Sequence, residues 1–198
     1  MDLMGKLQKN NICAVMTTFF PESSLLTHLK RIQKQVGYII IIDDTGSSSH
    51  GFDYDLSGFN AVYLKNENNY GIAKSLNIGV NQAIVLGFEW ILTLDDDTLL
   101  SKTYTDELIE FCNMNSNLVP EIGMIALTRG NERYSKQEDR YYRNKRTLIT
   151  SGSMFHIDRF KCVGGFDEKL FIDLVDFYFC TKLRKNGFKI VQLSNLGM

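Results

Sequence analysis

Three consecutive carboxylates follow a short apolar run near the middle of the chain. Residues 90–94 read Trp-Ile-Leu-Thr-Leu and lead directly into Asp95, Asp96 and Asp97. An apolar run of this composition predicts a buried strand. Like charges side by side at its end are unfavourable without a counter-charge, and Mg²⁺ and Mn²⁺ prefer carboxylate oxygens. The stretch fits either a metal site that holds an anionic ligand such as a nucleotide diphosphate, or a polar loop with an aspartate helix cap.

A second apolar run, residues 38–42, also ends in acids. Asp43 and Asp44 follow it, and the Thr-Gly-Ser-Ser-Ser sequence at residues 45–49 is typical of a turn. Ligands of open α/β sheets bind beyond the carboxyl ends of the strands. We therefore expect the two acidic strand ends to share one site at one edge of a sheet.

Two further acids, Asp173 and Asp176, lie in an aromatic-rich stretch at residues 166–180. Carboxylates beside so much apolar surface are costly unless they are paired, capping or functional. Asp176 fits the N-cap of a helix that runs to Asn186. It also fits a carboxylate of raised proton affinity, which suits a general base that takes a hydroxyl proton.

Composition and charge restrict the class of protein. A length of 198 residues and a hydrophobic content of 44% predict one ordered domain. The net charge of −1 predicts no nucleic-acid partner. The four cysteines lack the spacing of a zinc or redox pair, which suits a reducing compartment. No apolar run reaches about 18 residues and the N-terminus lacks a signal-peptide core. We expect a cytoplasmic protein, with peripheral contact at the inner face of the cell membrane left open.

The elements that must position these acids alternate along the chain. This alternation predicts an α/β fold in a single domain, with a mostly parallel central sheet flanked by helices. The histidines at positions 28, 50 and 156 are interpreted as surface, loop and strand residues. The apolar periodicity predicts strands at residues 12–18, 38–42, 61–64, 90–94, 122–128, 148–153, 154–157 and 189–193, and helices at 22–36, 72–86, 103–115, 158–163 and 176–186.

One long segment has no apolar periodicity. Residues 129–146 contain seven lysines and arginines against three acids, with tyrosines interleaved. The pattern predicts a long polar loop, and such loops are usually functional or disordered. It fits either a solvated loop or a lid that faces an acceptor.

Six segments carry recognisable motifs, in this order along the chain: residues 14–18, 41–47, 69–79, 94–97, 150–153 and 171–176. Taken in order, these motifs resemble those of family 2 glycosyltransferases with the GT-A fold, and most of all the rhamnosyltransferase-like subgroup. A lone Asp-x-Asp is common, but six motifs in the right order are specific. The resemblance implies one GT-A glycosyltransferase catalytic domain over residues 1–198. Members usually continue into acceptor-binding helices, so it also implies that the C-terminal acceptor-binding region is missing.

The resemblance implies a role for each matched residue. Asp176 matches the catalytic base, with Asp173 as the substitute. Asp95 and Asp97 match the ligands of a divalent cofactor, Mg²⁺ or Mn²⁺, with Asp97 the more direct ligand. Asp44 is expected to contact the base of the nucleotide. The residues implied to bind the nucleotide sugar are Thr17, Asp43, Asp44, Asn69, Lys74, Asn77, Asp95, Asp96, Ser151 and Gly152.

The implied activity is an inverting, metal-dependent transfer of a sugar. The sugar, rhamnose or another deoxyhexose, moves from a dTDP- or UDP-sugar to a glycan or lipid-linked acceptor in cell-surface polysaccharide synthesis. The alternative is a nucleotide-sugar-binding module without catalysis. A nucleotidyltransferase is disfavoured because the N-terminal part lacks a Gly-rich, lysine-containing phosphate loop. The sequence departs from the family at Phe19-Phe20, and at residues 194–197, where many members place a histidine that could bind metal.

Overall fold

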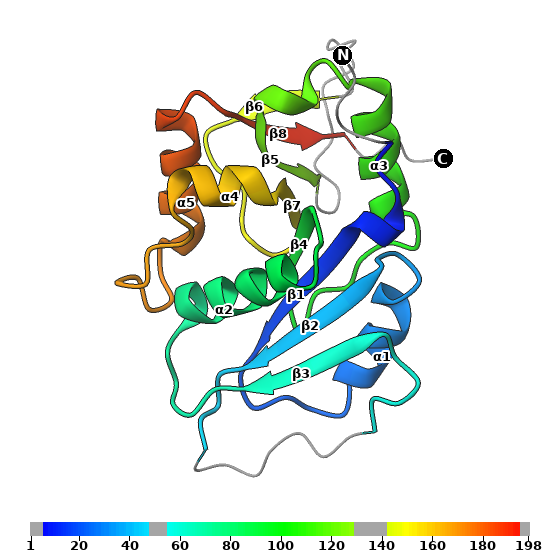
Figure 1. Ribbon diagram of the computed structural model, residues 1–198, viewed down its shortest axis with the longest axis vertical. Coiled ribbons are helices and arrows are strands. Elements are labelled where there is room, and N and C mark those ends of the chain that lie inside the picture. The colour runs from blue at the N-terminus through cyan, green and yellow to red at the C-terminus, as the bar shows by residue number, and fades with distance from the viewer. Residues whose placement is uncertain (1–5, 48–54, 129–141, 195–198) are drawn as a thin grey trace.

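The computed structural model describes residues 6–47, 55–128 and 142–194. His50, the end of the predicted turn at residues 45–49, most of the predicted loop at 129–146 and residues 195–197 lie outside these ranges. The centre is an eight-stranded sheet in the order β3-β2-β1-β4-β7-β5-β8-β6 (Figure 1). The strands are β1 (Ile12–Thr18), β2 (Tyr38–Asp43), β3 (Ala61–Lys65), β4 (Trp90–Asp95), β5 (Ile122–Leu127), β6 (Tyr142–Lys145), β7 (Ser153–His156) and β8 (Lys189–Leu193).

Five α-helices are described, and they cover both faces of the sheet (Figure 1). They are α1 (Leu25–Ile32), α2 (Ile72–Val85), α3 (Tyr104–Met114), α4 (Ile157–Val163) and α5 (Val175–Lys185), with single 3₁₀ turns at Lys9–Asn11 and Val119–Glu121. None of the described helices is both long and apolar enough to cross a lipid bilayer.

The strands β3, β2, β1 and β4 run parallel and form one half of the sheet. Their carboxyl ends therefore meet at one edge, where Thr17 of β1 pairs with Asp95 of β4. Every residue of β1 is buried, as expected for a parallel strand that is covered on both faces. This half confirms the prediction that the acidic strand ends share one edge.

The other half of the sheet changes direction. Strand β7 lies antiparallel between β4 and β5, while β5 and β8 are parallel and β6 closes the edge antiparallel to β8. Because β7 runs opposite to β4, its first residue, Ser153, pairs with Thr93 near the carboxyl end of β4. The turn that precedes β7 is thereby brought to the edge that carries the acids.

The core consists of two apolar layers, one on each face of the sheet. On β1, Ile12, Ala14 and Met16 belong to the layer that α1 and α3 complete, whereas Cys13 and Val15 belong to the layer that α2, α4 and α5 complete. This division follows the alternation of side chains along a strand. Each helix contributes an apolar stripe to one layer, so the sheet is held rigidly between them.

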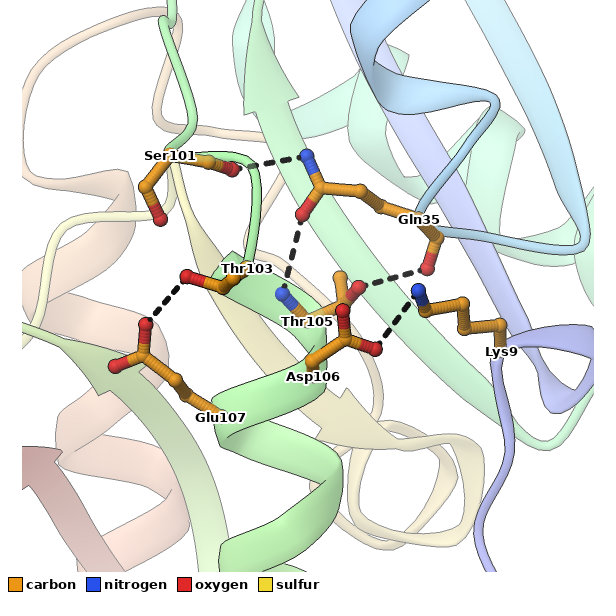
Figure 2. Close-up of polar contacts among 7 residues, drawn as sticks. All are labelled: Lys9, Gln35, Ser101, Thr103, Thr105, Asp106 and Glu107. Atoms are coloured by element: carbon orange, nitrogen blue, oxygen red, sulfur yellow. Dashed lines mark hydrogen bonds and ion pairs between the residues drawn. The ribbon is translucent and has the colours of Figure 1, made fainter. Parts of the chain in front are cut away.

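A buried glutamine joins the segment after α1 to the start of α3 (Figure 2). Gln35 is 2% exposed, and its amide donates to the Ser101 carbonyl (3.0 Å) and accepts from the Thr105 N–H (3.2 Å). The Thr105 hydroxyl returns a hydrogen bond to the Gln35 carbonyl (2.8 Å). Lys9 and Asp106 add an exposed ion pair (2.7 Å). These bonds anchor the segment that leads from β4 to α3.

The structure corrects three predicted elements. Residues 142–145, assigned to the polar loop, form β6, since an edge strand need not be apolar on both faces. Residues 148–152, predicted as strand, form an irregular segment and a turn, because Gly152 adopts a left-handed conformation (φ 81°). The helix predicted at 22–36 covers only Leu25–Ile32.

Candidate active site

An acidic turn extends β4 at the carboxyl edge of the sheet. The Thr98 N–H donates to the Asp95 carbonyl (3.2 Å), which closes the turn over residues 95–98. Asp95 and Asp96 are half-buried and Asp97 is exposed. Three carboxylates are therefore presented at adjacent positions, beside Thr17 on β1. The structure thus places the first acidic motif at the end of a buried strand, as the sequence predicts.

Two side chains that the sequence analysis does not assign to the site hold the middle of this turn. The Thr18 hydroxyl donates to the Asp96 carboxylate. The Nδ1 atom of His28 on α1 contacts the Asp96 carbonyl, and since a carbonyl only accepts, this nitrogen carries the proton. The interpretation of His28 as a plain surface residue is therefore wrong. The only signal for Thr18 is its place at the end of the first strand.

The turn before β7 is fastened to the acidic turn. The Asp95 N–H donates to the Ser151 hydroxyl (3.1 Å), which also contacts the Thr98 hydroxyl. The Gly152 N–H donates to the Thr93 carbonyl (2.7 Å). Ser151 is only 3% exposed. Two residues that the resemblance places under the donor sugar, Ser151 and Gly152, therefore lie beside Asp95.

The carboxylates suit a cation that a ligand helps to hold. Within the described ranges, no three His, Cys, Asp or Glu side chains converge as a metal-binding group. Asp96 already accepts from Thr18 and Asp97 is exposed, so Asp97 is better placed than Asp96 to bind a cation. Mg²⁺ is commonly bound by one or two carboxylates together with substrate phosphates. This donor set fits Mg²⁺ or Mn²⁺ when diphosphate oxygens complete the coordination.

The second acidic motif is buried and hydrogen-bonded. Asp43 is 1% exposed, and it accepts from the Thr45 N–H (2.9 Å), the Thr45 hydroxyl and the Tyr63 hydroxyl. Thr45 also accepts from the N–H of Phe20 (2.8 Å). Asp43 therefore fixes the loops that follow β1 and β2.

Asp44 organises the next loop. Its carboxylate accepts from the Asn66 side-chain amide (2.7 Å) and from the N–H groups of Tyr70 (2.8 Å) and Gly71 (2.7 Å). A carboxylate has about four lone-pair positions, so these three bonds leave about one for a ligand. A contact with the nucleotide base, as the resemblance implies, must use that remaining position.

Three other residues predicted to bind the nucleotide, Asn69, Lys74 and Asn77, have different surroundings. Asn69 is exposed beside Gly71, and the Lys74 ammonium lies 3.6 Å from the centre of the Tyr70 ring. Asn77 instead faces the segment around Phe166: its amide donates to the Phe166 carbonyl (3.0 Å) and to Glu168 (2.9 Å), and it accepts from the Phe166 N–H (2.9 Å). Asn77 therefore has a structural role, and we remove it from the nucleotide site.

The predicted base lies in the first turn of α5. Asp176 is half-buried and accepts from the Phe177 N–H (2.7 Å). The residue that caps α5 is Leu174, which adopts a left-handed conformation (φ 65°) and makes no side-chain cap. The interpretation of Asp176 as the N-cap is therefore wrong, although a carboxylate in the first turn is favoured by the helix dipole. Asp173 is exposed.

The stretch that carries the Asp173 and Asp176 carboxylates also contains large apolar side chains that are not packed into the core. Five large apolar residues in this stretch are at least 45% exposed: Phe171, Ile172, Leu174, Phe177 and Tyr178. The backbone of the stretch is nevertheless anchored, since the Ile72 N–H at the start of α2 donates to the Phe171 carbonyl (2.7 Å). A Cβ atom on Gly71 would lie 2.3 Å from that carbonyl oxygen. The segment that carries Asp173 is therefore pressed against the loop that Asp44 organises.

Comparisons with known proteins agree with this geometry. Residues 13–168 match the family model described as glycosyl transferase family 2. The chain is 27% identical to the dTDP-rhamnosyl transferase RfbF of Shigella flexneri over 212 residues, which cover 96% of this chain and 68% of that protein.

Solved structures share the fold at low identity. TarS residues 1–349 of S. aureus, in complex with UDP-GlcNAc, superpose with a TM-score of 0.66 and 16% identity, covering 94% of this chain and 59% of that one. GalNAc-T7 with UDP, GalNAc and Mn²⁺ gives 0.67 and 13%, covering 94% and 43%. The chain therefore spans only part of the length of these two proteins.

Proposed function

Because the chain belongs to glycosyl transferase family 2 and is rhamnosyltransferase-like, we propose that it transfers rhamnose or another deoxyhexose from a nucleotide-diphosphate sugar. The acceptor is a glycan or lipid-linked molecule of cell-surface polysaccharide synthesis. The observation that carries the proposal is the acidic turn of residues 95–98, fastened to Ser151 at the carboxyl edge of the sheet. The similarity to a dTDP-rhamnosyl transferase supports dTDP as the nucleotide, with UDP as the second candidate.

The donor is proposed to lie along the carboxyl edge of β2, β1 and β4. The nucleoside lies toward Asp43 and Asp44, with Asn69 and Lys74 on the adjoining loop. Thr17 and Asp95, which pair between β1 and β4, lie toward the ribose and the diphosphate. Ser151 and Gly152 support the sugar. The half-buried Lys74 side chain brings the positive charge that an anionic donor needs.

Asp95 and Asp97 are the proposed holders of a divalent cation, Mg²⁺ or Mn²⁺. The bound ion acts as a Lewis acid that neutralises the charge developing on the diphosphate leaving group. The contribution of the chain is positional. Thr18 and His28 fix Asp96 between the two holders, so the turn does not need to reorganise when the donor binds.

Asp176 is the proposed general base, with Asp173 as the substitute. Its carboxylate takes the proton from the acceptor hydroxyl as the acceptor oxygen attacks the anomeric carbon. Attack from the side opposite the leaving diphosphate inverts that carbon. The one hydrogen bond described for the Asp176 carboxylate comes from the Phe177 N–H, so acceptor positions remain for an incoming hydroxyl.

Calorimetric titration with dTDP and UDP, with and without Mn²⁺, tests the donor site. We expect Mn²⁺ to strengthen nucleotide binding. We expect Asp97→Ala to lower the Mn²⁺-dependent affinity at least about tenfold, because the metal loses a carboxylate ligand. Glu110→Ala, an exposed acid on α3, is the matched control. Unchanged metal-dependent affinity in Asp97→Ala would overturn the metal assignment.

Release of dTDP from dTDP-rhamnose tests catalysis in the same protein. We expect Asp176→Asn to bind dTDP normally but to release it at least about a hundredfold more slowly with acceptor present, a loss typical of a missing general base. Full activity in this variant moves the base to Asp173. Absence of all turnover in the unaltered chain, with dTDP still bound, supports the alternative of a binding module.

A further inference from the structure

A cavity of about 200 Å³ opens next to the proposed donor site. It lies beside the last residues of β5, and its walls include Tyr104, Leu127, Lys145, Leu148, Ser151 and Gln192. We call it the Lys145 cavity. One water molecule occupies about 30 Å³ of liquid, so the cavity has room for a small polar group with part of a sugar ring, but not for a whole oligosaccharide.

The described lining of the Lys145 cavity carries positive charge. Its described lining residues include Lys145 and no carboxylate. In residues 6–47, 55–128 and 142–194, the ammonium of half-buried Lys145 has no hydrogen bond or ion pair. Arg143 lies two positions earlier on the same face of β6, and its guanidinium donates twice to Gln192 in the cavity wall (2.9 and 3.2 Å). With one ammonium and no carboxylate among its described lining residues, the cavity favours an anionic occupant.

The Lys145 cavity also lies between the two reacting sides of the proposed site. On one side, its wall residue Ser151 accepts from the Asp95 N–H of the acidic turn (3.1 Å). On the other side, the Leu148 N–H donates to the Cys180 sulfur of α5 (3.4 Å). Cys180 follows Asp176 by four residues, so both lie on one side of α5, one turn apart.

From this placement, we propose that the Lys145 cavity binds an anionic group of the acceptor, a carboxylate or a phosphate carried on its sugar. The inference rests on the proposed function, because it identifies the occupant as the molecule that receives the donor sugar. Charge-assisted hydrogen bonds from an ammonium are stronger than neutral ones. Lys145 then selects acidic sugars over neutral ones and orients the acceptor hydroxyl between Ser151 and Asp176.

Ligand-observed NMR titration of the complete 198-residue chain, saturated with dTDP, tests the inference. The probes are glucuronate, glucose 6-phosphate and neutral glucose. We expect at least one of the anionic sugars to bind at least about tenfold more tightly than glucose, and Lys145→Gln to abolish that preference. Lys145→Arg, which keeps the charge, retains it. Arg146→Gln, which removes the same charge from the next, exposed residue outside the cavity wall, leaves it unchanged.

Each result has one meaning. Preference for glucuronate alone identifies a carboxylate, and preference for glucose 6-phosphate alone identifies a phosphate. Equal binding of all three sugars, no binding of any, or an anion preference that survives in Lys145→Gln overturns the inference. Calorimetry with dTDP on the same samples keeps the two proposals separate. Intact dTDP binding without an anion preference overturns only the cavity assignment, whereas loss of dTDP binding in the unaltered chain overturns the donor site itself.

Discussion

Thr18 and His28 hold the central residue of the acidic turn from two directions, one through its carboxylate and one through its carbonyl. Ser151 holds the residue before it. The turn is therefore shaped by hydrogen bonds from three separate segments.

Removal of the His28 contact should weaken nucleotide binding without unfolding the protein. We expect His28→Ala to lower Mn²⁺-dependent dTDP affinity roughly three- to tenfold, the range for one neutral hydrogen bond. His28→Asn should recover most of the loss, because its amide N–H can take the place of Nδ1–H. Calorimetry measures the affinity and thermal unfolding monitors the fold. Equal affinity in His28→Ala would show that the contact does not position the turn.

At single positions, the sequence predicts where acids gather but not which partners they have. Asp43 and Asp44 follow an apolar run, and that pattern alone places them at a strand end. Their partners Tyr63 and Asn66 are 20 and 22 residues away, a separation that no local pattern reveals. Asn77 is misassigned for the same reason, since it holds Phe166 across 89 residues of chain.

Leu174 gives the start of α5 an unusual form. It is one of two non-glycine residues with positive φ in the described chain, and it is 61% exposed. A left-handed conformation costs an L-residue about 1–2 kcal/mol, and this side chain recovers little of that cost by burial. Strain of this kind tends to persist at functional sites, and Leu174 lies between Asp173 and Asp176.

Leu174→Gly should therefore stabilise the protein. Glycine removes the left-handed penalty but is more flexible in the unfolded chain, so we expect a net gain of about 0.5–1 kcal/mol. Leu99→Gly is the control, because Leu99 is equally exposed (64%) but has negative φ. It should lose stability instead. Urea unfolding at equilibrium measures the free energy of unfolding of both variants. A loss of stability in Leu174→Gly would show that Leu174 is not strained.

Elements with strong apolar periodicity are predicted well, and weak ones are not. Strands β1 and β8 have their predicted bounds, because apolar and β-branched residues predominate in each. Strand β6 escapes prediction since it pairs on only one side and carries charged residues. The antiparallel insertion of β7 is also not predicted, because a strand sequence does not encode the direction of its neighbours.

The whole molecule buries three of its four cysteines in the two apolar layers. Burial raises the pKa of the Cys13 and Cys112 thiols to about 12 and that of Cys180 to about 11. A thiolate is the reactive form of cysteine, so these thiols are protected both by their pKa and by the surrounding core. Cys162 on α4 is exposed.

A thiol-specific chromogenic reagent at neutral pH should therefore modify one cysteine in the native protein and four in denaturant. Cys162→Ser should abolish the native reaction and leave three thiols reactive after unfolding. Mass spectrometry of the labelled peptides identifies the site. Rapid native labelling of Cys13 or Cys112 would show that the sheet opens far more often than a packed core allows.

The position of β8 has a consequence for how the protein is made. Strands β3, β2, β1 and β4 are all synthesised by residue 95, whereas β8 must enter between β5 and β6 after every other strand exists. A growing polypeptide thus contains the complete parallel half of the sheet, β3, β2, β1 and β4, before Gln192, the last wall residue of the Lys145 cavity, leaves the ribosome. Until then β5 presents an open edge, the kind of surface that invites aggregation, so translation that stalls before Lys189 leaves that edge uncovered.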